Sequence, residues 1–391
     1  MGRIIAKVQR ALNHPLQTEP LLPPSIHKQS VFRISRSILC FPFLLFVFFH
    51  SSIAKEVEVC TTCKIKTIAA AIAKADSNDV VVINEGIYNE YDLKINKPLF
   101  LKGSGNVIID GNKKGEILRV TSDNVSIKGL TFRNVGISYT KDHSAIILHK
   151  ADSFLIEDCL LEAVFFGMLI EKSHHGTIRG NTISSNGTGE ENSGNGIHLW
   201  HCSDIDIEQN HVFKLRDGIY FEFVTNSRVV GNISHNNFRY GLHFMFSNDD
   251  EYTDNEFYEN GAGVAVMFSK FILMKRNKFI KNWGSASYGL LLKEIYDAQI
   301  IDNLFEENTI GINVEGCTRI EYQHNDLVGN GWAIKIAGAC YANGFLGNNF
   351  KSNSFDLSYN SQMNDNRFTG NYWSEYTGYD LDNNGIGDVP Y

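Results

Sequence analysis

The clearest pattern along the chain is a short alternation of apolar and polar residues that returns at a regular interval. Glycine followed by apolar, variable and apolar residues begins at Gly167 and recurs six times, and a last copy begins with Ala333. The steps between copies are 29, 22, 23, 22, 26, 22 and 22 residues. Alternation with a period of two indicates strands, and a repeat of this length indicates a solenoid.

A column of asparagines advances with nearly the same steps, which are 29, 22, 23, 22, 26, 22 and 23 residues. Two columns in phase predict an all-β fold, a single-stranded right-handed parallel β-helix with coils of about 22 residues. Asparagines stacked at a corner form amide ladders, so we assign them no function. The column consists of Asn181, Asn210, Asn232, Asn255, Asn277, Asn303, Asn325 and Asn348.

The alternation also predicts which side chains form the core. One residue on either side of each outward position should point into the coil, where stacked equivalents make a continuous apolar column. The predicted inward residues of four consecutive coils are Ile197, Leu199, Ile219, Phe221, Leu242, Phe244, Val264 and Val266.

Four segments follow from these patterns. An extension with a signal peptide occupies residues 1–54, and an N-terminal cap occupies 55–80. The β-helix spans 81–373, and an acidic loop closes the chain at 374–391. Within the cap, the Ala-rich run 67–75 predicts a short amphipathic helix that covers the open end of the coil.

The signal peptide is predicted near residues 33–54. Arg33 and Arg36 precede the apolar run Ile38 to Phe49, and small residues follow it. This order is typical of an export signal, and the run is too short for a comfortable membrane span. We therefore expect a periplasmic protein, peripheral to the membrane; an uncleaved N-terminal anchor is the alternative.

Composition narrows the range of partners. The 33 glycines and 7 prolines suit many tight corners that leave the strands intact. A net charge of −8, with scattered basic residues, argues against nucleic acid as a partner. We expect no organic cofactor.

Two insertions interrupt the repeat just before the glycine strand. The segments from Asn181 to Gly196 and from Asn277 to Gly289 exceed the usual spacing of 8 or 9 residues. Insertions in a solenoid often mark its binding face. Between them lies a group of outward positions, hereafter the strip, which we expect to be exposed: His198, Trp200, Tyr220, Glu222, His243, Met245, Ala265 and Met267.

Histidine and methionine are suitable ligands for Cu(I). Met245 and Met267 should lie one coil apart, about 4.8 Å, whereas His198 and His243 are two coils apart. A copper site made of His243, Met245 and Met267 is thus easier to close than one that pairs His198 with His243. The alternatives are a protein contact patch and ordinary surface. In a contact patch, the partner-binding residues are Trp200, Tyr220 and Glu222.

Cysteines add two local hypotheses. Cys60 and Cys63 form a CxxC pair that fits a disulfide, a metal clip or a redox pair, and the disulfide is favoured in an oxidising compartment. Cys317 and Cys340 should occupy neighbouring coils and could also bond.

A cluster of acidic and amide residues near the end resembles the first half of a calcium loop. Asp380, Asp382, Asn384 and Asp388 are spaced to offer oxygen ligands, with Gly385 at the sixth position. Position twelve is Tyr391 instead of glutamate, so a complete EF-hand is excluded. A looser calcium loop and a plain Asx-rich turn both remain.

The final segment, Gly370-Asn-Tyr-Trp-Ser-Glu-Tyr-Thr-Gly-Tyr-Asp-Leu-Asp-Asn-Asn-Gly-Ile-Gly-Asp-Val-Pro-Tyr391, resembles the NosD family of nitrous oxide reductase maturation proteins. The resemblance runs from about residue 55 and includes Cys60 to Cys63. It implies a non-catalytic periplasmic protein that works with the membrane and ATPase subunits of an ABC transporter and with a copper chaperone. The implied task is assembly of the copper–sulfur site of nitrous oxide reductase.

One departure from the family pattern concerns the end of the chain. Family members usually continue beyond the Gly-Asp-x-Pro motif, whereas this chain stops at Tyr391. If the further segment docks on the transporter, either docking is in doubt here or the chain is truncated.

Two other classes of function compete with this hypothesis. Parallel β-helices host polysaccharide lyases, hydrolases and epimerases, and fold alone does not exclude them. Such enzymes need paired carboxylates, whereas the strip offers only Glu222. An envelope adhesin without a metal role is the third hypothesis.

Overall fold

The computed structural model describes residues 54–138, 140–284, 287–360, 365–389 and 391. The expected signal peptide therefore lies almost entirely outside the described residues. Ile53 to Tyr391 form one compact unit. Across the described ranges, no helix has the length and apolar character that crossing a membrane requires.

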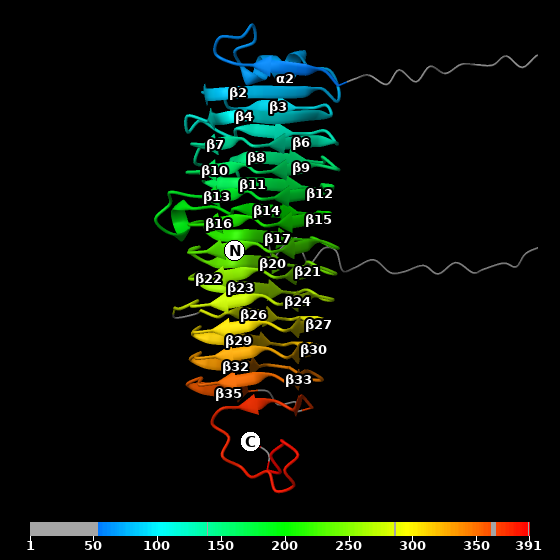
Figure 1. Cartoon of the computed structure of the whole chain (residues 1–391), viewed down its shortest axis with the longest axis vertical. Coiled ribbons are helices and arrows are strands. Elements are labelled where there is room, and N and C mark those ends of the chain that lie inside the picture. The colour runs from blue at the N-terminus through cyan, green and yellow to red at the C-terminus, as the bar shows by residue number, and fades with distance from the viewer. Residues whose placement is uncertain (1–53, 139, 285–286, 361–364, 390) are drawn as a thin grey trace, which may run out of the picture. The chain divides into compact units, whose positions relative to one another are not determined.

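The described residues wind into a right-handed parallel β-helix, as predicted (Figure 1). A typical coil contributes one strand to a sheet of twelve strands and two strands to a sheet of twenty-five. The smaller sheet carries the strip. Its strands are β3 (Leu93–Ile95), β5 (Leu118–Val120), β8 (Ser144–His149), β11 (Phe166–Glu171), β14 (Ile197–Trp200), β17 (Asp217–Glu222), β20 (Tyr240–Met245), β23 (Ala262–Met267), β26 (Leu290–Lys293), β29 (Ile310–Glu315), β32 (Trp332–Ala337) and β35 (Phe355–Asn360).

The larger sheet begins with three strands at the N-terminal end and then continues as two parallel series, one on each of the remaining faces. The first strands are β1 (Glu56–Val59), β2 (Val80–Tyr88) and β4 (Leu99–Asp110). One series is β6 (Val125–Lys128), β9 (Leu155–Glu157), β12 (His174–Arg179), β15 (Ser203–Glu208), β18 (Arg228–Val230), β21 (Glu251–Thr253), β24 (Leu273–Lys275), β27 (Tyr296–Ile301), β30 (Thr318–Gln323), β33 (Gly344–Leu346) and β36 (Arg367–Thr369). The other is β7 (Thr131–Arg133), β10 (Leu160–Glu162), β13 (Thr182–Ser184), β16 (His211–Phe213), β19 (Ile233–His235), β22 (Glu256–Tyr258), β25 (Lys278–Ile280), β28 (Leu304–Glu306), β31 (Asp326–Val328), β34 (Asn349–Lys351) and β37 (Tyr372–Trp373).

The predicted register is confirmed. All eight residues expected to point inward have no exposed surface and belong to one continuous core cluster. Large aromatic rings fill the same core from the opposite faces, for example Phe279 and Phe305, whose centroids are 4.5 Å apart. Burial of this apolar surface supplies the main driving force for stacking the coils.

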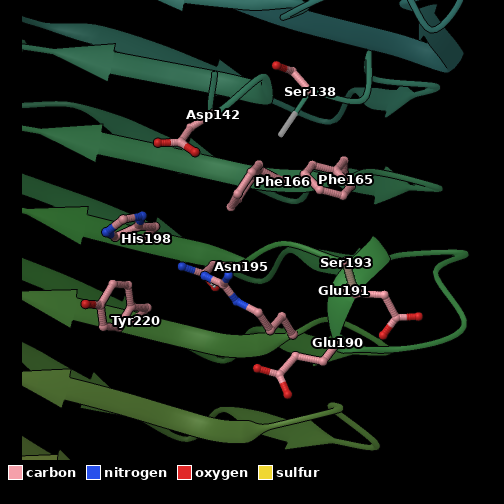
Figure 2. Close-up of a pocket in the computed structure, with 11 residues that line it drawn as sticks. Ser138, Asp142, Phe165, Phe166, Glu190, Glu191, Ser193, Asn195, His198 and Tyr220 are labelled. Atoms are coloured by element: carbon pink, nitrogen blue, oxygen red, sulfur yellow. Dashed lines mark hydrogen bonds between the residues drawn. The ribbon is translucent and has the colours of Figure 1, made fainter. Parts of the chain in front are cut away.

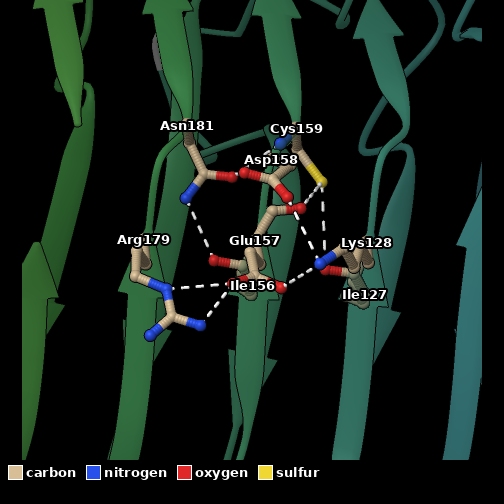
Figure 3. Close-up of polar contacts among 8 residues, drawn as sticks. All are labelled: Ile127, Lys128, Ile156, Glu157, Asp158, Cys159, Arg179 and Asn181. Carbon is tan, nitrogen blue, oxygen red and sulfur yellow. Dashed lines mark hydrogen bonds and ion pairs between the residues drawn. The ribbon is translucent and has the colours of Figure 1, made fainter. Parts of the chain in front are cut away.

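The asparagine column forms the predicted amide ladder. Asn232 is typical: its backbone N–H and its side-chain amide both donate to Oδ1 of Asn255, at 2.9 and 3.0 Å. Figure 3 shows the first member, Asn181, whose Oδ1 accepts from the backbone of Cys159 and whose Nδ2 donates to the carbonyl of Ile156. A second ladder, which sequence reasoning missed, comprises Asn237, Asn260, Asn282, Asn308, Asn330 and Asn353.

Ion pairs also join neighbouring coils on the surface. Glu157 accepts from Lys128 on the preceding coil, at 2.6 Å, and from the Arg179 Nε on the following coil, at 2.9 Å (Figure 3). The pKa of Glu157 lies below its ordinary value because of these hydrogen bonds, that of Lys128 first.

The N-terminal end is closed by the predicted helix, α2 (Ile68–Lys74). The Thr67 hydroxyl accepts from the Ala70 N–H, and the Glu90 carboxylate accepts from the first two N–H groups of the helix. These contacts satisfy donors that a helix start leaves unpaired. Strand β1 precedes the helix and pairs with β2, so the segment expected as a cap also carries the first strand of the larger sheet.

The cysteines divide into two groups. Cys60 and Cys63, beside the helix, are joined by a disulfide. Cys317 and Cys340 do occupy neighbouring coils, and the Cys317 N–H donates to the Cys340 sulfur at 3.3 Å, but no disulfide joins these two buried thiols. Burial raises the pKa of Cys317 to about 12, so this thiol stays protonated.

Candidate functional site

The strip lies on the outer face of the smaller sheet, across β14, β17, β20 and β23. Strand register arranges it as two columns. One column runs through His198, Tyr220, His243 and Ala265; the other runs through Trp200, Glu222, Met245 and Met267.

The first column is not exposed as expected. His243 retains 6% of its surface and Ala265 none, so the predicted exposure is wrong at these two positions. The cause is stacking of rings on the outer face. Tyr220 lies between His198 and His243, with centroid separations of 4.6 and 4.8 Å. Tyr240 covers His243 from its own strand, also at 4.8 Å.

His243 is nevertheless short of hydrogen-bond partners. Both ring nitrogens are buried without one, although Nδ1 lies 3.5 Å from the Asp217 Oδ2. Asp217 is itself held by Arg239, which donates from Nε at 2.7 Å and from a second guanidinium nitrogen. Burial raises the pKa of Asp217, but the hydrogen bonds from Arg239 and the nearby His243 ring outweigh this effect and hold the pKa below its ordinary value.

Two thioethers adjoin this histidine. Met245 follows His243 by two residues on the same face of β20, and Met267 is the register partner of Met245 on the next coil. Both methionines are half-buried, and the Met245 sulfur lies 4.0 Å from the Tyr220 hydroxyl. Unpartnered imidazole nitrogens beside two soft sulfurs are a donor set that fits Cu(I).

The predicted partner-binding residues are partly exposed. The Trp200 ring receives the Lys172 ammonium at 5.0 Å, and Glu222 lies beside Met245 in register. Tyr220 is covered more fully by its ring neighbours.

A feature that sequence reasoning missed borders the strip. His201, Phe223, Phe246 and Phe268 immediately follow the second column and stack coil upon coil, at 4.6, 5.2 and 5.2 Å; we call them the aromatic column. The three phenylalanines are 39%, 39% and 42% exposed. Exposed aromatic rings in a row are typical of contact surfaces.

The aromatic column occupies a corner where the backbone has a positive φ. His201, Phe223, Phe246 and Phe268 have φ between 51° and 57°, a region that favours glycine or asparagine. The equivalent corner of later coils does contain Gly316 and Gly338. Lys150, Lys172 and Glu294 adopt the same conformation at this corner of other coils, so the fold accepts polar side chains there and does not require exposed rings.

A cavity of about 540 Å³ lies at the other edge of the strip (Figure 2). His198 and Tyr220 line one side, Phe165 and Phe166 lie above, and the first inserted loop contributes Glu190, Glu191, Ser193 and Asn195. This loop contains the 3₁₀ turn Glu190–Asn192. Sequence reasoning gave the loop a role in binding but missed Asp142, Phe166 and Arg216. Phe166 begins β11, whereas Asp142 and Arg216 precede β8 and β17, and all three occupy positions whose residue type varies from coil to coil.

His198 belongs to this cavity more than to the methionine pair. Burial and then the Arg216 charge lower the pKa of His198 to about 4, so the ring is neutral at pH 7. Its Nε2 has no hydrogen-bond partner.

The C-terminal acidic residues form an exposed group. Oxygen atoms of Asp380, Asp382 and Asp388 lie within 4.8 Å of one another. Asp380 accepts from the backbone of Asn384 and Gly385, and Asp388 from the backbone of Leu381. These are the bonds of an Asx-rich turn, and the calcium role stays a prediction.

The sequence matches one known protein family along most of the chain. Residues 70–193 and 186–378 match the model of a family described as periplasmic copper-binding protein (NosD). A probable ABC transporter binding protein NosD from Pseudomonas aeruginosa is 29% identical over 318 residues, covering 76% of this chain and 73% of that protein. A protein of the same description from Stutzerimonas stutzeri is 28% identical over 319 residues, covering 76% and 72%.

Among solved structures, a family 28 exopolygalacturonase from Yersinia enterocolitica superposes with a TM-score of 0.59. It is 11% identical, with 81% of this chain and 78% of that chain covered. At this identity the match supports the parallel β-helix fold alone.

Proposed function

Because the chain belongs to the NosD family of periplasmic copper-binding proteins, we propose that it is a non-catalytic accessory protein in maturation of the copper–sulfur site of nitrous oxide reductase. Its relatives are described as probable ABC transporter binding proteins, which supports association with a transporter. Copper in this scheme is cargo that the protein receives and passes on.

The observation that carries the copper part is the pairing of Met245 with Met267 beside His243. Cu(I) prefers soft ligands and accepts low coordination numbers, so two thioethers and one imidazole suffice. Partial exposure of the methionines leaves them open to a donor protein, while burial of His243 keeps its nitrogens from competing water. The side chains that would hold the ion thus combine access with a preference for a soft metal.

The aromatic column supplies the partner surface in this proposal. It lies directly beside Met245 and Met267, so a protein that packs against Phe246 and Phe268 would cover the thioethers. Aromatic residues are enriched at the centres of protein interfaces. Copper transfer between docked proteins needs this proximity of the contact surface to the ligands.

The test replaces both thioethers. The Met245→Leu/Met267→Leu variant keeps apolar volume and should fold normally. Cu(I) affinity, measured by competition with a colorimetric chelator, should fall at least tenfold, and adding His243→Ala should abolish binding. Reductase matured beside the variant should lack its copper–sulfur absorption.

The matched control is Met168→Leu/Met274→Leu, because both sulfurs lie in the core. It should bind Cu(I) like the parent protein. If the parent protein binds no Cu(I) and the thioether variant only loses partner association, the strip is a contact surface alone. Normal reductase maturation with the triple variant would contradict both versions.

The rival enzyme hypothesis is tested directly. Purified protein should neither cleave nor epimerise uronate polymers. Turnover that depends on Glu222, Asp142 or Glu190 would refute the non-catalytic assignment.

A further inference from the structure

The cavity beside the inserted loop contains an unusual concentration of unsatisfied polar atoms. Nine buried side-chain atoms among the described residues have no hydrogen-bond partner, and three of them belong to residues that line this cavity. They are the Ser193 Oγ, the His198 Nε2 and the Arg216 Nε. Burying such groups without partners costs free energy, so their gathering around one opening indicates a ligand that pairs with them.

Arg216 determines the charge that this ligand should carry. One guanidinium nitrogen donates to the Asn195 Oδ1 at 3.1 Å. In the described ranges, no carboxylate forms an ion pair with Arg216, although Asp217 is the next residue. Asp217 is occupied by Arg239 instead. Arg216 therefore presents a planar cation that none of the described carboxylates contacts directly, and this shape matches the two oxygens of a carboxylate.

The remaining walls indicate what the carboxylate is attached to. Phe166 offers an apolar ring, while Asp142, Glu190 and Glu191 surround the opening with acceptors. A simple anion would gain nothing from these acids, whereas hydroxyl groups would donate to them. A volume of about 540 Å³ lies within the range of small-molecule sites.

We infer that this cavity binds a sugar acid of the hexuronate type. Its carboxylate pairs with Arg216, its ring lies against Phe166, and its hydroxyls bond to Ser193, His198 and the acidic rim. The site is separate from the methionine pair, so this inference does not depend on the proposed copper function. It concerns binding and invokes no reaction.

The experiment compares three probes by isothermal titration: glucuronate, glucose and acetate. Glucuronate should bind, whereas glucose lacks the carboxylate and acetate lacks the ring and hydroxyls, so each should bind at least tenfold more weakly. Binding of acetate as tight as that of glucuronate would reduce the site to a general anion site and overturn the inference. Absence of glucuronate binding would also overturn it.

Two variants test whether glucuronate binds at Arg216. Arg216→Gln should weaken glucuronate at least tenfold, since it removes a charge-assisted pair, and should leave Cu(I) affinity unchanged. The control is Arg228→Gln, an arginine paired with Asp206 on the larger sheet. It should bind glucuronate normally. Circular dichroism establishes that each variant is folded, and glucuronate binding within twofold of the parent in folded Arg216→Gln contradicts the assignment.

Discussion

The ion pair of Arg239 with Asp217 gives the most direct test of how the strip is held together. Asp217 has a fully buried side chain, whereas Arg239 is 32% exposed. Replacing Arg239 by methionine leaves a carboxylate in a site that water does not reach. Removing one partner of a buried pair typically costs about 3–5 kcal/mol. Because Arg239 is partly exposed, we expect about 3 kcal/mol, at the lower end of that range.

A double-mutant cycle separates loss of the pair from loss of packing. In Asp217→Asn the buried charge is gone, so a further Arg239→Met change should cost little. The interaction free energy should therefore be about 2 kcal/mol. Denaturant unfolding followed by circular dichroism measures the three variants, and unfolding rates replace equilibrium values if refolding fails.

The chain provides a matched control for geometry. Arg276 contacts Asp254 through the same two-pronged arrangement, at 2.7 and 2.7 Å, but both side chains are nearly half exposed. Arg276→Met should leave the free energy of unfolding nearly unchanged, because water screens an exposed pair. Additive effects in the Asp217–Arg239 cycle, or an equal loss in the Arg276 variant, would refute the reasoning that burial makes the first pair matter.

Two further predictions concern pH and the aromatic column. The pKa of His198, about 4 when folded, lies below its unfolded value near 6.5, so the unfolded chain binds more protons between these values. The contribution of His198 to the free energy of unfolding should then be fully present above pH 6.5, and it should fall by up to about 3 kcal/mol as the pH drops to 4. In urea titrations, His198→Gln should show a shallower loss of stability on acidification than the parent protein. The exposed control His324→Gln should show the same loss as the parent. Phe246→Asn suits the positive φ and should change stability by less than about 1 kcal/mol, because relief of strain offsets lost stacking. Binding to detergent-solubilised cognate transporter should fall at least tenfold, and undiminished binding would remove the column from the interface.

The fold could be predicted because the same pattern of apolar and polar residues recurs in every coil. Ile219 and Phe221 occupy the same inward positions as Leu242 and Phe244, so one register error would have conflicted with several coils at once. The Asn181 ladder was visible for the same reason. The Asn237 ladder was missed although its signal is equally regular, because each member stands five residues after a member of the Asn181 column, beginning with Asn232.

The site was predicted less completely, because side chains from different strands determine exposure. His243 is outward in register, yet Tyr220 and Tyr240 cover it, and alternation cannot indicate what neighbouring rings do. The cavity depends on Arg216 and Asp142, which no repeat marks. The aromatic column could have been found by comparing corner residues, since phenylalanine stands where other coils use lysine, glutamate or glycine.

The Asn181 ladder has a direction. Each side-chain amide donates to the Oδ1 of the next member toward the C-terminus and to a backbone carbonyl of an earlier coil, so donors and acceptors follow the same order from Asn181 to Asn371. A coil inserted or deleted as a whole preserves this order, whereas a change of a few residues within a strand displaces an amide from its neighbours. The length of such a protein can therefore change in steps of one coil, with smaller changes confined to corner loops. We therefore expect the lengths of related β-helices to differ mainly by whole coils, in multiples of about 22 residues.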